Sequence, residues 1–241
     1  MNTIELNINN LKSLWKTVGM ERGLSFENHA LAGVYIRDES WPNRIWLKDE
    51  SALENWQLAV EFMDANPGLT LTAFGEPSIE YASLRLLSTQ YGMVKAIDRS
   101  PRQSELTLIR VSDDETAKEW SALFSVSFGY SISAKTVQST RESIEYYLAR
   151  VDGELVGTAV LYGTDSLVMG VHSMGVLRVF RGRGYARQIM QALFFIVKDR
   201  PQTHLVLQAS EAGKPLYEKM GFHTEFIQQN YAQTAKNKNN D

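Results

Sequence analysis

The chain has 241 residues, of which 44% are hydrophobic, and its formal net charge is −3 at pH 7. This length supplies either one large domain or two small ones with buried cores. The sequence contains no cysteine, which excludes disulfides, thiolate metal sites and cysteinyl acyl intermediates, and we expect no metal site. The slightly negative charge argues against broad binding to polyanions, so we expect no nucleic-acid partner.

The sequence also lacks the signals of a membrane protein. No apolar run approaches the ~20 residues that span a bilayer. The first residues, Met1 to Glu5, lack the basic and apolar regions of a signal peptide. We therefore expect a cytoplasmic protein without a membrane partner, and the sequence leaves both a monomer and a homodimer open.

Helices and strands are predicted to alternate over the first hundred residues. The spacing of apolar residues predicts helices over 6–18, 51–63 and 79–90. Residues 20–29 are predicted to form a loop. The expected strands, which alternate or are rich in apolar residues, are 31–36, 44–47, 69–74 and 93–97.

The second half begins with a strand over 106–111. A capping box at 112–115 then starts a helix whose apolar face ends at Gly129, and a second helix is predicted over 133–144. The next expected strands are 147–151 and 155–162, joined by an Asp-Gly turn, and 166–177. The polar tail from Gln233 is expected to be disordered.

The junction between the last of these strands and the next helix is the most informative stretch. The strand ends near Phe180, and a helix with apolar periodicity runs over 188–197. The exposed N–H groups and the dipole of a helix start favour acidic residues, yet this first turn carries only basic ones. A bound phosphate would resolve the conflict, because amides, dipole and guanidiniums would all face negative charge. The basic residues are Arg181, Arg183 and Arg187.

The junction resembles a known signature. The run Arg181-x-x-Gly184-x-Ala186 is similar to the Q/R-x-x-G-x-G/A signature of the GCN5-related N-acetyltransferases (GNAT family). In that family the loop amides hold the pyrophosphate of acetyl-CoA. The resemblance therefore names the anion that the arginines and glycines would bind.

Two flanking segments extend this resemblance. Val176 and Phe180 fit the family's V-x-P-x-Y/H-R lead-in, although Arg178 replaces the usual proline. Downstream, the run Leu-Tyr-Glu-Lys-Met-Gly-Phe at 216–222 resembles the family's L-Y-x-x-x-G-F helix. The match covers roughly residues 105–230 and is much fainter before them.

The resemblance implies an α/β fold with a mixed, mostly antiparallel central sheet flanked by helices. It places an acetyltransferase domain at 104–232, after an N-terminal α/β domain at 1–103 and before a tail at 233–241. When Gly92 is aligned with Gly221, the end of the first half weakly resembles the end of the second, since in both a predicted helix leads into a glycine and a strand. One hypothesis is that the first half is a degenerate, inactive copy of the same fold, and an unrelated α/β extension is the other.

The resemblance also implies acetyl-CoA as a cosubstrate. Ser210 stands where the family commonly has asparagine, and Gly213 replaces a usual alanine, so contacts to the pantetheine arm depart from the pattern there. The residues that the resemblance assigns to acetyl-CoA are Val176, Arg178, Arg181, Gly182, Arg183, Gly184, Tyr185, Ala186, Arg187 and Ser210.

Two catalytic residues are expected. Tyr217 matches the family's tyrosine that hydrogen-bonds the sulfur of CoA; a phenol of pKa about 10 is a weaker acid than a thiol of pKa about 8.5, so a hydrogen bond is the expected role. A backbone N–H within 175–177 would bind the oxyanion. An alkylamine with a pKa near 10.4 must lose a proton. His172 is a candidate base acting through water, and Glu145, Glu211 and water chains remain open.

We therefore expect an N-acetyltransferase that transfers the acetyl group directly to a primary amine of a small molecule or a protein. The resemblance implies that the loop 128–131 borders the acceptor pocket, and Trp41 and Trp46 from the first half are expected to help line it. A noncatalytic acyl-CoA-binding regulator is the alternative, and it would not need Tyr217. An aminoacyl-tRNA-dependent transferase would need a basic surface, which the net charge does not favour.

Overall fold

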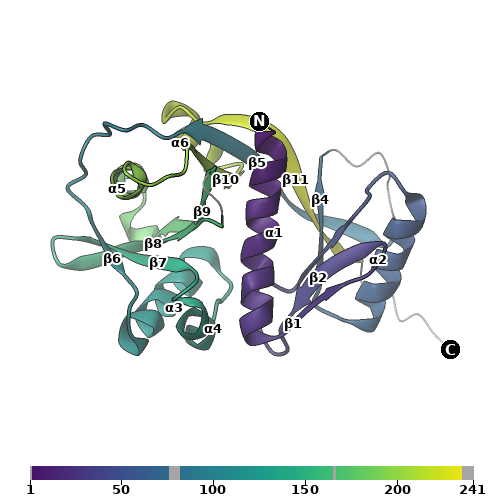
Figure 1. Cartoon of the computed structure of the whole chain (residues 1–241). Coiled ribbons are helices and arrows are strands. Elements are labelled where there is room, and N and C mark those ends of the chain that lie inside the picture. Colours follow the sequence, from purple (N-terminus) through teal and green to yellow (C-terminus); the bar gives the residue numbers. More distant parts are fainter. Residues whose placement is uncertain (1, 76–81, 165–166, 235–241) are drawn as a thin grey trace.

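The computed structural model describes residues 2–75, 82–164 and 167–234 (Figure 1). In the first half the helices and strands are α1 (Thr3–Arg22), β1 (Leu24–Glu27), β2 (Leu31–Tyr35), β3 (Arg44–Leu47), α2 (Leu53–Ala65), β4 (Thr70–Phe74) and β5 (Leu84–Ala96). In the second half they are β6 (Thr107–Arg110), α3 (Asp114–Phe128), α4 (Ala134–Thr140), β7 (Glu145–Val151), β8 (Glu154–Tyr162), β9 (Val168–Val176), a 3-10 turn η1 (Arg178–Phe180), α5 (Tyr185–Val197), β10 (His204–Ser210), α6 (Lys214–Lys219) and β11 (His223–Gln233).

Both halves contribute to one sheet. Across the described residues its strand order is β1-β2-β3-β4-β11-β5-β10-β9-β8-β7-β6. Parallel pairing occurs at β3 with β4 and at β9 with β10, and the other neighbours are antiparallel. The predicted fold class, a mixed and mostly antiparallel sheet flanked by helices, is confirmed.

The two halves repeat one pairing pattern and exchange their last strands. In the first half an antiparallel β1-β2-β3 meander crosses over through α2 to the parallel β4, and β7-β8-β9, α5 and β10 do the same in the second. The next strand of each half pairs with the other half: β5 pairs with β10, and β11 pairs with β4. β5 and β11 then pair with each other at the centre.

Side-chain alternation in the strands divides the core between the two faces of this sheet. One face packs against α1 and α3, with Trp15, Trp46 and Trp120 in its core. The opposite face packs against α5 and α6 in the second half and against α2 in the first. Figure 1 shows α1 standing between the two halves, where it contacts β2, β5, β9 and α4.

Several sequence predictions are confirmed with small shifts at their ends, and others are wrong. The predicted helix at 79–90 is strand β5 from Leu84 onward, while 79–81 lie outside the described residues. Its leucines fit a helical spacing, but pairing with β11 from Leu84 onward, and with β10 from Gln90 onward, overrides that local pattern. The predicted loop at 20–29 contains the end of α1 and strand β1, and α4 ends at Thr140 rather than near residue 144.

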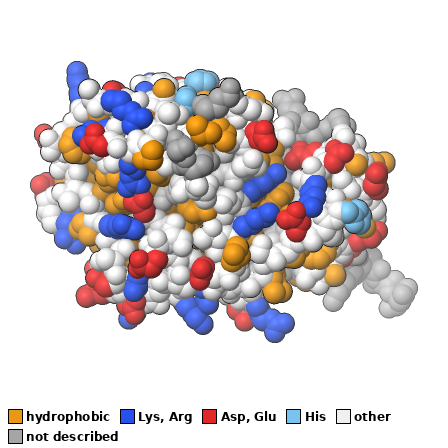
Figure 2. Space-filling view, in the orientation of Figure 1, with side chains coloured by type: hydrophobic (Ala, Val, Ile, Leu, Met, Phe, Trp, Pro, Cys, Tyr) orange, Lys and Arg blue, Asp and Glu red, His pale blue; other side chains and the backbone are white. Residues whose placement is uncertain are grey.

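The division of the chain at 103/104 stays a prediction. The tail predicted to be disordered from Gln233 begins later, because Gln233 is the last residue of β11, and 235–241 lie outside the described residues. None of the helices within 2–75, 82–164 and 167–234 has the length and apolar character needed to cross a bilayer. On the face seen in Figure 2, lysine and arginine side chains lie interspersed with acidic ones.

Candidate functional site

The central feature of the second half is a split between β9 and β10. The two strands pair in parallel only at their first residues, from His204 opposite Val168 to Val206 opposite Gly170. Beyond these residues β9 keeps β8 and β10 keeps β5, but the two strands do not pair with each other within the described sheet. Backbone groups of β9 therefore face an open edge, where an extended ligand can pair like an added strand.

A β-bulge helps to separate the two strands. The β8–β9 register shifts between Thr158 and Val160, and Ser173 has a positive φ of 49°. Thr158 Oγ1 donates to Ser173 O at 3.0 Å, which fixes the bulge. An extra residue of this kind bends the strand that carries it, so β9 turns away from β10 beyond the bulge.

The structure selects one backbone amide from the stretch 175–177. Leu177 N–H donates to Val156 O at 2.9 Å, so Leu177 faces β8. Because residues alternate in an antiparallel ladder, the N–H of Val176 faces away from β8, toward the split. The carbonyl of Val176 points the same way and accepts a hydrogen bond from Arg181 Nε at 3.1 Å.

The loop after β9 forms an open cradle of backbone amides. Gly182 and Gly184 have φ values of 77° and 81°, and a Cβ added at either glycine would meet no atom within 4 Å. Gly184 is the N-cap of α5, and no side chain of the described residues caps that helix. The first N–H groups of α5 are thus available, and its first turn has no acidic residue. These features fit an anion.

The arginines of this loop have different roles. Arg181 donates from Nε to Val176 O and from Nη2 to Ser127 O at 2.9 Å, so it ties the loop to β9 and α3 instead of leaving its whole guanidinium for a ligand. Arg183 lies over the Phe180 ring at 5.6 Å and is exposed. Three guanidiniums were predicted to face one phosphate, but Arg181 has only part of its guanidinium free to do so.

The remaining loop residues predicted to bind the cofactor lie around this cradle. Arg178 is exposed in η1, Tyr185 packs edge-on against Phe180 at 6.1 Å, and Ala186 is half-buried against the core. Ser210 ends β10, and its Oγ accepts from Gly213 N at 3.2 Å. Ser210 therefore supports the turn into α6.

A cavity of about 200 Å³ adjoins the cradle, between α5, α6 and the chain after β5. Its charged lining residues are Lys95, Asp98, Arg102, Arg187 and Lys219. Four cations face one carboxylate, so the cavity fits a further anionic group. The sequence did not indicate this cavity, because Lys95 and Arg102 reach α5 only through the pairing of β5 with β10.

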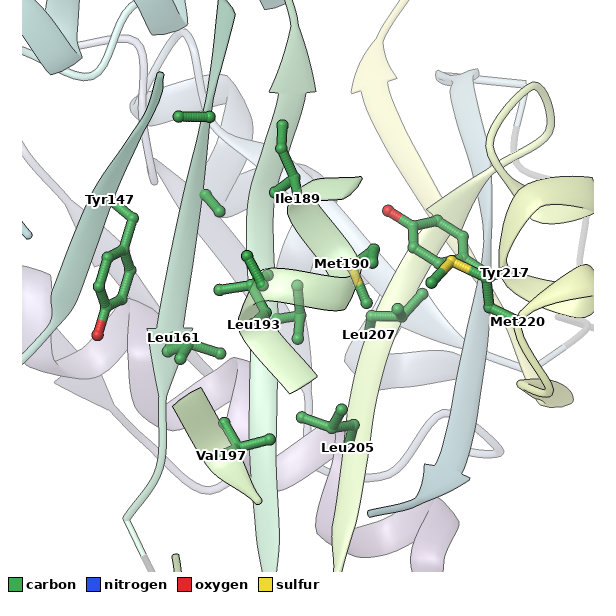
Figure 3. Packing of buried hydrophobic residues seen from close by; sticks show 14 of the residues in the cluster. Tyr147, Leu161, Ile189, Met190, Leu193, Val197, Leu205, Leu207, Tyr217 and Met220 are labelled. Carbon is green, nitrogen blue, oxygen red and sulfur yellow. The ribbon is translucent and has the colours of Figure 1, made fainter. Parts of the chain in front are cut away.

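Tyr217 lies on the α5/α6 face of the sheet. Its ring packs edge-on against Phe222 at 5.8 Å, and the residue is 7% exposed. Figure 3 shows its hydroxyl directed away from α6, toward the α5 side of the cluster. The hydroxyl has no hydrogen-bond partner among the residues that the structure describes, and burial raises the pKa of Tyr217. The phenol therefore stays protonated and can donate to a ligand.

His172 lies on the opposite face, under α1. Its Nε2 lies 3.0 Å from Asn10 Oδ1, and burial lowers the pKa of His172 to about 4, although a hydrogen bond to Gln208 opposes this fall. The other candidate bases are also engaged. Glu145 binds Arg200 through both carboxylate oxygens, at 2.6 and 2.8 Å, and Glu211 accepts from Tyr91. Among the described residues, all three candidate bases therefore have partners of their own.

The low pKa of His172 predicts a pH dependence of stability. Since the folded pKa of about 4 lies below the usual histidine value of 6.5, the unfolded chain binds more protons between these values. The contribution is present above pH 6.5 and is lost as pH falls toward 4, amounting to about 3 kcal/mol at most. In His172→Gln, the free energy of unfolding from urea titrations is expected to fall less over this window than in the wild type. The exposed His29→Gln serves as the control, and parallel pH curves for His172→Gln and wild type would contradict the assignment.

The loop at 128–131 that was expected to border the acceptor lies beside β9. A Cβ added at Gly175 would be 2.5 Å from the Phe128 ring, so this ring covers the strand next to Val176. Trp41 and Trp46, which were expected to help line the acceptor pocket, are 8% and 3% exposed and belong to the core under α1.

Comparisons with known proteins agree with this geometry. Residues 113–222 match the model of the acetyltransferase (GNAT) family. A GCN5-related N-acetyltransferase from Kribbella flavida superposes with a TM-score of 0.65 at 16% identity, over 95% of this chain and 96% of that one. A GCN5-related N-acetyltransferase from Sphaerobacter thermophilus superposes with a TM-score of 0.58 at 18% identity, over 85% of this chain and 76% of that one. A tandem GNAT protein from the clavulanic acid biosynthesis pathway superposes with a TM-score of 0.56 at 14% identity, over 84% of this chain and 78% of that one. No curated protein sequence matches the chain.

The split sheet and the amide cradle thus belong to a chain with the N-acetyltransferase fold. The match to the acetyltransferase (GNAT) family model covers residues 113–222, the part of the chain that contains the β9 edge and the amide cradle.

Proposed function

We propose that the protein is an acetyl-CoA-dependent N-acetyltransferase that transfers the acetyl group directly to a primary amine of a small molecule or a protein. The observation that carries this proposal is the continuity of two features in one run of chain. The unpaired edge of β9 leads within eight residues into the exposed amides at Gly182 and Gly184. A ligand with an amide-bearing arm and a diphosphate matches both features at once.

The chain's own groups can supply the steps of transfer. The edge of β9 would pair with the pantetheine arm, and the cradle would hold the pyrophosphate. Val176 N–H would stabilise the oxyanion that forms when the neutral amine attacks the thioester carbonyl. When the carbon–sulfur bond breaks, the Tyr217 hydroxyl would donate a hydrogen bond to the leaving thiolate. The amine proton would leave through water, since the candidate bases are engaged elsewhere.

The start of α2 supports a single binding site. In the repeated pattern of strands, α2 corresponds to α5, but the chain before it carries Asp49 and Glu50 and its first turn carries Glu54. Negative charge there repels a phosphate. The acidic side chains also interact favourably with the helix dipole, so no bound anion is needed at this end of α2. We therefore assign acetyl-CoA to the second half alone, and this assignment agrees with the hypothesis of an inactive first copy.

The basic cavity would take the nucleotide end of CoA, which carries a further phosphate on its ribose. The double variant Lys95→Gln/Arg102→Gln is expected to bind acetyl-CoA about tenfold more weakly, as estimated for lost charge-assisted hydrogen bonds. Both Kd values are measured by calorimetry. The Kd of the double variant for acetyl-dephospho-CoA, which lacks the ribose phosphate, should stay within twofold of the wild-type Kd for that ligand. Equal losses for both ligands would place the ribose phosphate elsewhere.

The direct test of the proposed function is binding and turnover. Calorimetry is expected to show one molecule of acetyl-CoA bound per chain, and a panel of amines should release free CoA thiol. Because the chain has no cysteine, a thiol reagent reports CoA without protein background. A protein that binds acetyl-CoA but acetylates no amine would instead support the noncatalytic regulator.

A further inference from the structure

Arg44, on β3, is a half-buried cation whose charge is not neutralised within the described residues. Its Nη1 donates to Thr72 Oγ1 at 3.1 Å and to Asn230 Oδ1 at 2.8 Å, and its guanidinium lies 5.1 Å from the centre of the Trp15 ring. Its Nε is buried without a partner, and none of the ion pairs in the described part of the chain includes Arg44. Both Nε and Nη2, the edge of the guanidinium that can grip a carboxylate, lack partners there.

The same protein pairs its other partly buried arginines with carboxylates. Arg22 contacts Glu39 at 3.4 Å, Arg141 contacts Asp114 at 2.6 Å, and Arg200 binds Glu145 through both oxygens. Taking a cation out of water without a counterion is costly. Burial lowers the pKa of Arg44, but a guanidinium remains protonated at neutral pH. An unpaired cation of this kind is explained by an anion that binds to it.

The loop between α3 and α4 connects Arg44 with the split. Burial raises the pKa of Tyr130, and the positive charge of Arg44 partly offsets this rise, so the guanidinium and the phenol are near enough to interact. The Tyr130 ring lies 6.1 Å from the Phe128 ring, which covers Gly175 on β9. Ser40 Oγ donates to Ser131 O at 2.8 Å and holds this loop against the first half.

We propose that Arg44 binds the carboxylate of the acceptor, so that the preferred acceptors are free amino acids or similar small amines that carry a carboxylate. This inference rests on the proposed function. With its carboxylate on the guanidinium, such an acceptor would extend past Tyr130 and Phe128 and present at β9 an amine on its side chain, several bonds away from the carboxylate. Acceptors that bear no anion, including polyamines and peptide amides, would leave the cation unpaired.

The test compares free L-amino acids with the matching L-amino acid amides at saturating acetyl-CoA, using release of CoA thiol. The wild type is expected to acetylate at least one free acid with a kcat/KM about tenfold or more above that of its amide, the size expected for a hydrogen bond to a charged group. Arg44→Gln should bring this ratio close to one, mainly by raising KM for the acid. Arg44→Lys, which keeps the charge without the fork, should give an intermediate ratio.

The matched control is Arg22→Gln, because Arg22 is also partly buried on this side of the molecule but has its own carboxylate. That variant should keep the wild-type ratio of acid to amide. Melting temperature and the Kd for acetyl-CoA show whether each variant is folded. A wild type that binds acetyl-CoA but prefers amides, or acetylates none of the acids, overturns the inference, as does an unchanged ratio in Arg44→Gln. A wild type that does not bind acetyl-CoA instead overturns the proposed function.

Discussion

Gly184→Glu is expected to weaken binding of acetyl-CoA by about a hundredfold or more. A side chain at this position must adopt a φ of 81°, a left-handed conformation that costs roughly 1–2 kcal/mol for residues other than glycine. Its carboxylate would also lie at the start of α5, where the diphosphate is expected. Losing two charge-assisted hydrogen bonds costs about 3 kcal/mol or more, which corresponds to about a hundredfold in Kd.

Gly153→Glu is the matched control for this variant. Gly153 has a φ of 86° in the turn between β7 and β8, and a Cβ added there meets no atom within 4 Å, as at Gly184. The two variants therefore share the backbone strain and the added charge, but differ in position. Calorimetry should show a wild-type Kd for acetyl-CoA in Gly153→Glu. A normal Kd in Gly184→Glu would mean that the cradle does not hold the diphosphate.

Tyr217→Phe is expected to lower kcat by roughly 10- to 100-fold, near the lower end of what a positioned proton donor contributes. The change removes one hydroxyl and keeps the ring that packs against Phe222. Because burial raises the pKa of Tyr217, the wild-type phenol should remain a donor throughout the neutral and moderately alkaline range. The Kd for acetyl-CoA should change by less than about threefold, since the hydrogen bond matters most when charge develops on sulfur.

Tyr147→Phe is the comparison for this second variant. Tyr147 belongs to the same hydrophobic cluster and is 5% exposed, and Figure 3 shows it on the far side of α5 from Tyr217. Its hydroxyl donates to Glu145, so its loss should affect stability and leave kcat unchanged. Equal turnover by Tyr217→Phe and the wild type would reduce Tyr217 to a packing residue.

The sequence predicted the parts of this protein that local signals determine. The junction from Val176 to Ala186 combines a strand end, positive-φ glycines and a helix start within a few residues, and the structure contains each of them. The capping box of α3 is present, with Asp113 and Thr116 as its members. In such segments, neighbours in sequence are also neighbours in space, so composition and spacing suffice.

The remaining parts depend on pairing between distant segments. The first part of β5, up to residue 90, was mistaken for a helix because its leucines satisfy a helical spacing, whereas the strand predicted over 93–97 is confirmed. Pairing with β11 and β10 makes all of β5 one strand. The same pairing brings Lys95 to the basic cavity. Arg44 and Asn230 are separated by 186 residues and meet only because β11 lies beside β4. The partner of Arg181, the carbonyl of Ser127, has no signal in the sequence because it is a backbone atom.

The exchange of β5 and β11 has a consequence for how the two halves depend on each other. β5 lies between β10 and β11 in the sheet. A polypeptide of the second half alone would therefore lack the strand that pairs with β10, next to the proposed binding split. A polypeptide of the first half alone would likewise lack β11, the strand that pairs with β4. The first half thereby contributes a strand beside the proposed binding split, and removing either half would expose a strand edge of the other.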